Sequence, residues 1–148
     1  MSIFPTRVLL ATDGSNDARL AAEAAADLAA KTGSELHVLA VGRTFPTAVY
    51  ASYVDQAEDE LRREAQEVLD NEVRQIEDAG GEITQSYLRM GEERDEAIVH
   101  LAEEIDAGLI VVGSRGRGRI RRALMGSVSD SVVRHAHCPV MVVRNQNT

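Results

Sequence analysis

Short apolar runs alternate with longer helical stretches along this 148-residue chain, and this alternation constrains the fold more than any other feature. Most of the runs are typical of buried strands, whereas the stretches between them carry apolar residues at helical spacing. Because parallel strands need a crossover connection, which a helix usually supplies, the pattern predicts a parallel sheet with helices on both faces. The predicted strands are residues 8–11, 36–41, 82–89, 109–112 and 139–143.

Four helices are predicted between these strands, near residues 15–31, 55–79, 92–105 and 127–135. Residues 42–54 contain Gly42, Pro46 and several aromatic residues, and we predict a loop there. The length of the chain favours a single domain. We therefore expect one doubly wound α/β domain over residues 1–148, in which a ligand binds at the carboxyl ends of the strands.

Composition excludes several classes of protein. The net charge of −8 argues against indiscriminate binding of nucleic acid, and the aromatic content of 3% argues against stacking on its bases. A single cysteine, Cys138, rules out an intrachain disulfide framework and fits a reducing cytoplasm, the location we expect. No apolar stretch approaches the roughly 20 residues that span a bilayer, so no membrane association is predicted.

The charge is unevenly distributed. Residues 55–106 carry a net charge of −13, most of which we place on the solvated faces of helices and give no functional role. Residues 107–148 carry +6, and five of their arginines fall within the eight positions 115–122. Two interpretations remain open at this point: these arginines bind an anion, or they form a solvated loop that offsets the nearby acidic helices.

Glycines frame the same arginine-rich stretch. Gly113 and Gly116 follow the predicted central strand, where residues without a Cβ let backbone N–H groups approach a phosphate. Gly126 and Ser127 open the last helix, whose N-terminus attracts anions. A polyphosphate site is one interpretation, and a glycine-rich turn with a capping serine is the other. Neither a Walker A motif nor a dinucleotide-binding G-x-G-x-x-G motif is present.

The glycine spacing is specific enough to suggest a family. Gly113, Gly116, Gly126 and Ser127 fit the pattern G-x2-G-x9-G-[ST], which resembles the ATP-binding signature of the universal stress protein family. The opening segment 8–15 and the closing segments 126–129 and 138–143 resemble the same family, so the resemblance covers essentially the whole chain.

The resemblance implies a fold, a ligand and an assembly. The expected strand order is 3-2-1-4-5, the expected ligand is ATP with Mg²⁺, and a homodimer would pair the edge strands 139–143. Thr12 and Val41 would frame the adenine, and Asp13 would lie near the ribose or the metal, although Asp13 alone could also be a helix cap or a turn residue. The positions that would hold the ribose and phosphates are Gly113, Arg115, Gly116, Gly126, Ser127, Val128 and Ser129.

These expectations lead to a first hypothesis and two rivals. The first is an ATP-binding stress protein that senses or signals through nucleotide occupancy. A slow ATP-hydrolysing or nucleotidyl-transferring enzyme of the same architecture is the alternative, although no general base or nucleophile emerges from the sequence. Binding of nucleic acid through the arginine loop is the weaker rival. The sequence does not identify a protein partner.

Overall fold

The computed structural model describes residues 2–44, 51–115 and 125–145, and within them five strands alternate with four helices. The elements, in chain order, are β1 (Arg7–Thr12), α1 (Asn16–Thr32), β2 (Glu35–Arg43), α2 (Ala51–Asp78), β3 (Gln85–Gly91), α3 (Arg94–Glu104), β4 (Leu109–Gly113), α4 (Ser127–His135) and β5 (Val140–Val143). None of the described helices combines the length and the apolar character needed to cross a membrane.

The strands form one parallel sheet in the order β3-β2-β1-β4-β5, which confirms the expected order. Strand β1 lies at the centre and pairs with β2 on one side and with β4 on the other. The chain leaves β1 toward one edge of the sheet and later returns to build the other edge. The carboxyl ends of β1 and β4 therefore border the topological switch point, where open α/β sheets bind ligands.

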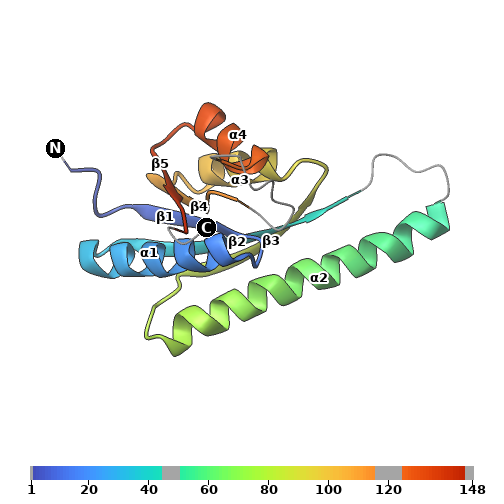
Figure 1. Cartoon of the computed structure of the whole chain (residues 1–148), viewed down its shortest axis with the longest axis horizontal. Helices are drawn as coiled ribbons and strands as arrows, with labels where there is room; N and C mark the ends of the chain where they lie inside the picture. The colour runs from blue at the N-terminus through green and yellow to red at the C-terminus, as the bar shows by residue number, and fades with distance from the viewer. Residues whose placement is uncertain (1, 45–50, 116–124, 146–148) are drawn as a thin grey trace.

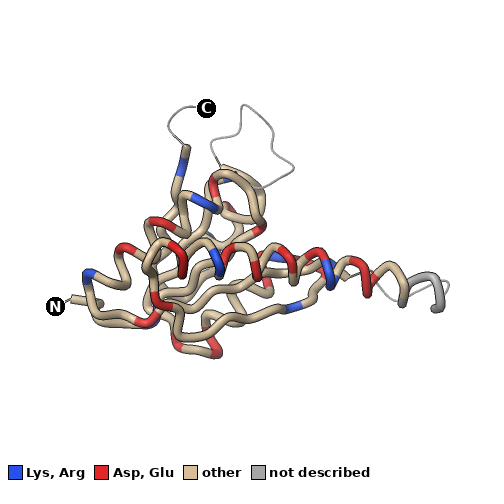
Figure 2. Tube along the Cα trace, turned by 90° about the horizontal axis from the view of Figure 1, so that it is seen from below, with Lys and Arg blue, Asp and Glu red and all other residues tan. Residues whose placement is uncertain are grey.

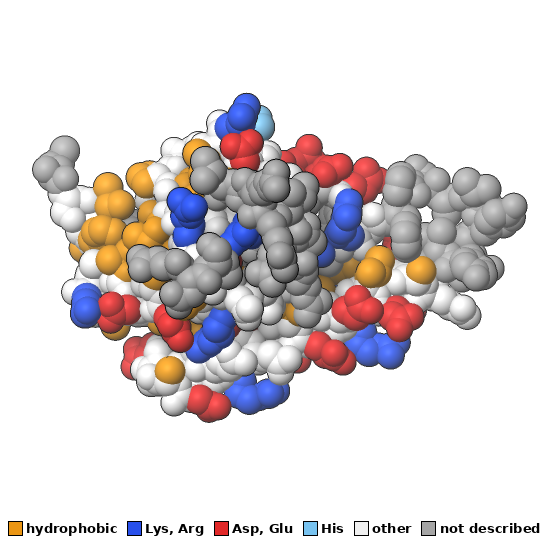
Figure 3. Space-filling view, viewed as in Figure 1, with side chains coloured by type: hydrophobic (Ala, Val, Ile, Leu, Met, Phe, Trp, Pro, Cys, Tyr) orange, Lys and Arg blue, Asp and Glu red, His pale blue; other side chains and the backbone are white. Residues whose placement is uncertain are grey.

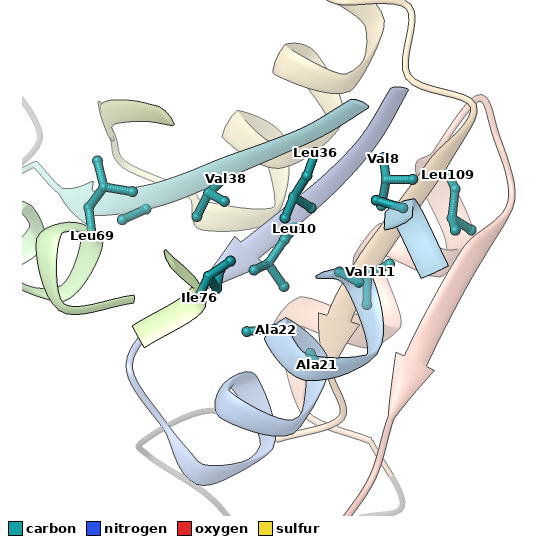
Figure 4. Close-up of a cluster of buried hydrophobic side chains, with 13 residues drawn as sticks. Val8, Leu10, Ala21, Ala22, Leu36, Val38, Leu69, Ile76, Leu109 and Val111 are labelled. Carbon is teal, nitrogen blue, oxygen red and sulfur yellow. The ribbon is translucent and has the colours of Figure 1, made fainter. Parts of the chain in front are cut away.

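Helices cover both faces of the sheet, with α1 and α2 on one side and α3 and α4 on the other (Figure 1). Alternate residues of the central strand divide between the two layers, as the two-residue period of a strand requires. Val8 and Leu10 pack against α1 and α2, in the cluster that Figure 4 shows. Leu9 and Ala11 pack against α3 and α4. This double burial explains why the central strands are continuous apolar runs.

The ends of α1 follow from local chemistry. Ser15 is the N-cap, and its hydroxyl accepts a hydrogen bond from the Ala18 N–H. Gly33 ends the helix with a φ of 68°, a left-handed conformation that a side chain disfavours. Asp13 therefore does not cap this helix, which excludes the helix-cap interpretation of that residue but not a role in the turn.

The predicted loop over residues 42–54 is too long at both ends. Strand β2 continues to Arg43, and α2 already begins at Ala51 rather than near residue 55. Gly42 suggested a turn, but it lies within β2, where neighbouring side chains pack closely against it. A Cβ at this position would lie 2.5 Å from Met90 Sδ and 3.1 Å from Ala65 Cβ. The third strand is likewise shifted from 82–89 to Gln85–Gly91.

Most acidic residues of α2 lie along its solvated face, as predicted, and Figures 2 and 3 show them interspersed with basic ones. With 28 residues the helix is about 42 Å long, and it extends beyond the sheet (Figure 1). Glu72 is an exception to the exposed acidic pattern because it is buried, with only 4% of its surface exposed. Its contacts lie at the site described next.

Candidate functional site

A cavity of about 280 Å³ opens at the carboxyl ends of β1, β2 and β4, next to the N-termini of α3 and α4. Its volume is near the lower end of the range of roughly 300–1,000 Å³ that is usual for small-molecule sites. Nine of the ten residues predicted from the sequence line this cavity: Thr12, Asp13, Val41, Gly113, Arg115, Gly126, Ser127, Val128 and Ser129. The tenth, Gly116, lies outside the described residues.

The turn that follows β1 is held by hydrogen bonds within it. The Gly14 N–H donates to the Thr12 hydroxyl at 3.2 Å, and the Ser15 N–H donates to Asp13 Oδ1 at 2.9 Å. The first contact fixes the path of the backbone, and the second fixes the Asp13 carboxylate beside the cavity. Asp13 is thereby oriented before any ligand arrives.

Glu72 anchors this turn from the opposite face of the sheet. The Thr12 hydroxyl donates to Glu72 Oε1 at 2.7 Å, and Arg19 Nη1 lies 2.7 Å from Glu72 Oε2. An ionised carboxylate only accepts hydrogen bonds, so Thr12 must be the donor and its lone pairs remain for Gly14. Burial of the carboxylate is costly, and these two donors offset that cost.

Glu72 was not predicted as a site residue, because most of the acidity of residues 55–106 was assigned to solvated helix faces. A signal was available in the spacing of the buried helix positions. The buried side of α2 includes Ala65, Leu69 and Ile76, and Glu72 follows the same spacing of three or four residues. A carboxylate at such a position indicates a partner inside the protein.

A second buried carboxylate fixes the end of β4. Asp17, in the first turn of α1, is 3% exposed. Its Oδ2 accepts from the Ser114 hydroxyl at 2.7 Å and from the Arg115 N–H at 3.2 Å. The Arg115 guanidinium also lies near, with Nε 3.9 Å from Oδ2. The first turn of α1 therefore holds the chain where it leaves the sheet toward the cavity.

Gly113 is required for packing between β4 and α1. A Cβ there would lie 2.7 Å from the backbone carbon of Asp17 and 2.8 Å from the Ala18 nitrogen. Since real Cβ atoms do not approach backbone so closely, only glycine fits. The sequence predicts that Gly113 lets a phosphate approach the backbone, and the structure adds a second reason for glycine here, the close contact between β4 and α1.

The N-terminus of α4 is hydrogen-bonded to the residue that follows β4. The Gly126 N–H and the Ser129 hydroxyl both donate to the Ser114 carbonyl, the latter at 2.8 Å. Ser129 is 3% exposed, and its hydroxyl links the first turn of α4 to the end of β4. Gly126 is the N-cap and no side chain caps the helix. The first turn of α4 is therefore suited to an anion.

The remaining walls combine an apolar surface with one further cation. Val41, Ile98 and Val112 line the cavity with aliphatic side chains, against which a flat ring can pack. Arg94, the first residue of α3, also lines it and was not predicted from the sequence. No histidine or cysteine is among the described lining residues. In the described part of the chain, no group of three or more His, Cys, Asp or Glu side chains is arranged to hold a metal ion.

Comparison with known proteins assigns the family. Residues 5–144 match the universal stress protein family. A putative universal stress protein of Staphylococcus aureus strain USA300 is 32% identical over 139 residues, which cover 94% of this chain and 84% of the relative. The chain belongs to the universal stress protein family.

Solved structures of this family share the fold. The universal stress protein UspA from Lactobacillus plantarum superposes with a TM-score of 0.80 at 26% identity, covering 95% of this chain and 98% of the other. A universal stress protein in complex with cAMP gives 0.71 at 26% identity, covering 94% and 97%. The Archaeoglobus fulgidus protein in complex with dAMP gives 0.69 at 28% identity, covering 96% and 99%. This chain is thus similar to universal stress proteins that were solved with adenine nucleotides.

Proposed function

We propose that this universal stress protein binds an adenine nucleotide in the cavity between β1, β4 and α4, with ATP as the expected ligand. Nucleotide occupancy would make it a sensor or signalling module in a stress response. The observation that carries the proposal is that nine residues, which the resemblance to the family assigns to the nucleotide site, line one cavity. The related proteins solved with cAMP and dAMP support the class of ligand.

The walls of the cavity suit the parts of such a ligand. The aliphatic side chains of Val41, Ile98 and Val112 would contact the adenine ring. The uncapped N-terminus of α4 would receive phosphate oxygens, because its backbone N–H groups and helix dipole favour negative charge. Asp13 would lie near the ribose or near a Mg²⁺ ion that accompanies ATP, since carboxylate oxygens suit that ion.

Nucleotide binding is tested by equilibrium dialysis of the purified protein against ATP with Mg²⁺. We expect saturable binding by the wild type, competition by AMP and dAMP, and weaker binding by Asp13→Ala. Arg74→Gln is the matched control, because Arg74 is exposed on α2. Acid extraction of the purified protein followed by chromatography would identify any nucleotide carried through purification. Negligible binding by all three proteins would refute the proposal.

The same proposal includes a homodimer through the edge strand β5. Strand β5 pairs only with β4 within the described sheet, and Met141 on it is 38% exposed. An uncovered apolar edge strand favours pairing with another copy. We expect the wild type to elute as a dimer in size-exclusion chromatography with light scattering. Met141→Lys, which places a charge on that edge, should shift the protein toward monomer, and a wild-type monomer would refute the assembly.

A further inference from the structure

Arg94 lines three cavities, two of which it shares with the first turn of α4. It lines the cavity already described and a second one of about 320 Å³ beside it. Ser127 and Val128, in the first turn of α4, line both cavities as well. Arg94 thus borders the same space as the helix N-terminus to which the proposed function assigns the phosphates.

The guanidinium of Arg94 has a donor that the protein leaves unused. Its Nε atom is buried, and none of the described residues accepts a hydrogen bond from it. The other buried arginine contacts near the site differ, because Arg19 pairs with Glu72 and Arg115 lies beside Asp17. The adjacent carboxylate of Asp95 already accepts from the Ser131 hydroxyl at 2.6 Å. A charged guanidinium without an acceptor is unfavourable, and because Arg94 lines a cavity we infer that a ligand interacts with this group.

The surrounding charges indicate where that acceptor lies. Arg43 lines the second cavity and adds positive charge, but Glu93 and Asp95 line it too and would repel an anion placed deeper there. The boundary between the cavities is different, because an anion there meets Arg94 on one side and the first turn of α4 on the other. Arginine and a helix N-terminus are both typical donors to phosphate.

We propose that the guanidinium of Arg94 donates a hydrogen bond to a phosphate oxygen of the bound nucleotide, beside the first turn of α4. The inference rests on the proposed function and adds a residue outside the glycine signature. Arg94 would thereby set the preference for phosphorylated ligands over the free nucleoside. Because Arg94 Nε has no partner among the described residues, its replacement should cost affinity and leave the stability of the ligand-free protein unchanged.

The test compares the affinities of adenosine, AMP and ATP for the wild type, Arg94→Gln and Arg94→Lys. We expect Arg94→Gln to weaken AMP and ATP by about tenfold or more, as loss of a charged hydrogen bond does, and to leave adenosine unchanged. Arg94→Lys keeps the charge without the Nε–H and should remain weaker than the wild type. The control Arg74→Gln should behave as the wild type, and the melting temperature of the ligand-free Arg94→Gln should match that of the wild type.

Each outcome bears on a different statement. If Arg94→Gln binds AMP as tightly as the wild type does, Arg94 does not contact a phosphate. If adenosine is weakened by the same factor as AMP, the residue acts on the nucleoside or on the fold, and the assignment is wrong. If the wild type binds none of the three ligands, the proposed function fails, and the assignment of Arg94 fails with it.

Discussion

Replacement of Glu72 by alanine tests whether a carboxylate on the far side of the sheet supports the cavity. The side chain is 4% exposed and receives hydrogen bonds from Thr12 and Arg19, both at 2.7 Å. Breaking a buried pair by removing one partner typically costs about 3–5 kcal/mol. The side chain of Arg19 is 32% exposed, so water can replace part of its lost interaction. We therefore expect Glu72→Ala to cost about 2–3 kcal/mol.

The assay is urea denaturation of the ligand-free protein, followed by nucleotide titration of the variants that fold. For a domain of this size, 2–3 kcal/mol corresponds to a fall in melting temperature of roughly 4–12 °C. Glu72→Gln should cost less, because its amide oxygen can still accept from Thr12. Nucleotide affinity should fall in both variants, since the turn that presents Asp13 loses its anchor.

The matched control is Glu67→Ala, which removes an exposed carboxylate from the same helix. Surface substitutions of this kind usually change stability by less than about 0.5 kcal/mol. If Glu72→Ala is no more destabilising than this control, the buried pair does not stabilise the fold and the reasoning is refuted. A cycle with Thr12→Val should also show a coupling between the two residues, since they share a hydrogen bond.

Three further predictions follow from local geometry. Gly113→Ala should cost about 1–3 kcal/mol in urea denaturation, because its Cβ would overlap the backbone of α1, and an unchanged midpoint would contradict this. Ser15→Ala should cost about 1 kcal/mol by removing the N-cap of α1, whereas Ser2→Ala, in an exposed terminal position, should be neutral. The hydrogen bond from His37 lowers the pKa of Glu35, with a smaller contribution from Arg7 and with desolvation opposing them. The contribution of Glu35 to stability should therefore be present above about pH 4.3, the usual Glu pKa, and be lost as the pH falls further. Glu35→Gln should flatten the dependence of the urea midpoint on pH in this range. An unchanged dependence would argue against the interaction between Glu35 and His37.

The layout of the sheet was predictable from the sequence because it depends on local patterns. The runs at 8–11 and 109–112 are apolar on both faces, which only strands buried between two helical layers require. The ends of elements were less predictable where a glycine serves packing. Gly42 was interpreted as the start of a loop, yet it lies within a strand, where Met90 and Ala65 pack closely against it.

The lining of the cavity was predictable to the extent that the resemblance supplied it. Arg94 was missed because no motif contains it, and its position depends on α3 packing beside α4. Asp17 was missed because helix N-termini commonly carry acidic residues for other reasons. Its partners, Ser114 and Arg115, lie almost one hundred residues away, so only the folded structure reveals the contact.

Asp17 and Glu72 together show how the site is divided between the two faces of the sheet. Helices α3 and α4, on one face, contribute walls of the cavity through Arg94, Ile98 and Ser127. Helices α1 and α2, on the other face, contribute carboxylates that fix the two chain segments leaving the sheet. Both carboxylates are linked to the first two turns of α1. Asp17 lies in these turns and contacts Ser114 and Arg115 at the end of β4. Arg19 pairs with Glu72, which accepts a hydrogen bond from Thr12 at the end of β1.

We therefore expect energetic coupling between Asp17, which holds the end of β4, and Arg19, which acts through Glu72 on the turn after β1. Asp17→Asn weakens the hold on Ser114 and Arg115, and Arg19→Gln weakens the hold on Glu72. Since both act through the first two turns of α1, their effects on nucleotide affinity should be non-additive, by at least about 0.5 kcal/mol. Isothermal titration of the single and double variants measures this. Strictly additive effects would contradict this, because they would mean that the turn after β1 and the end of β4 are positioned independently of each other.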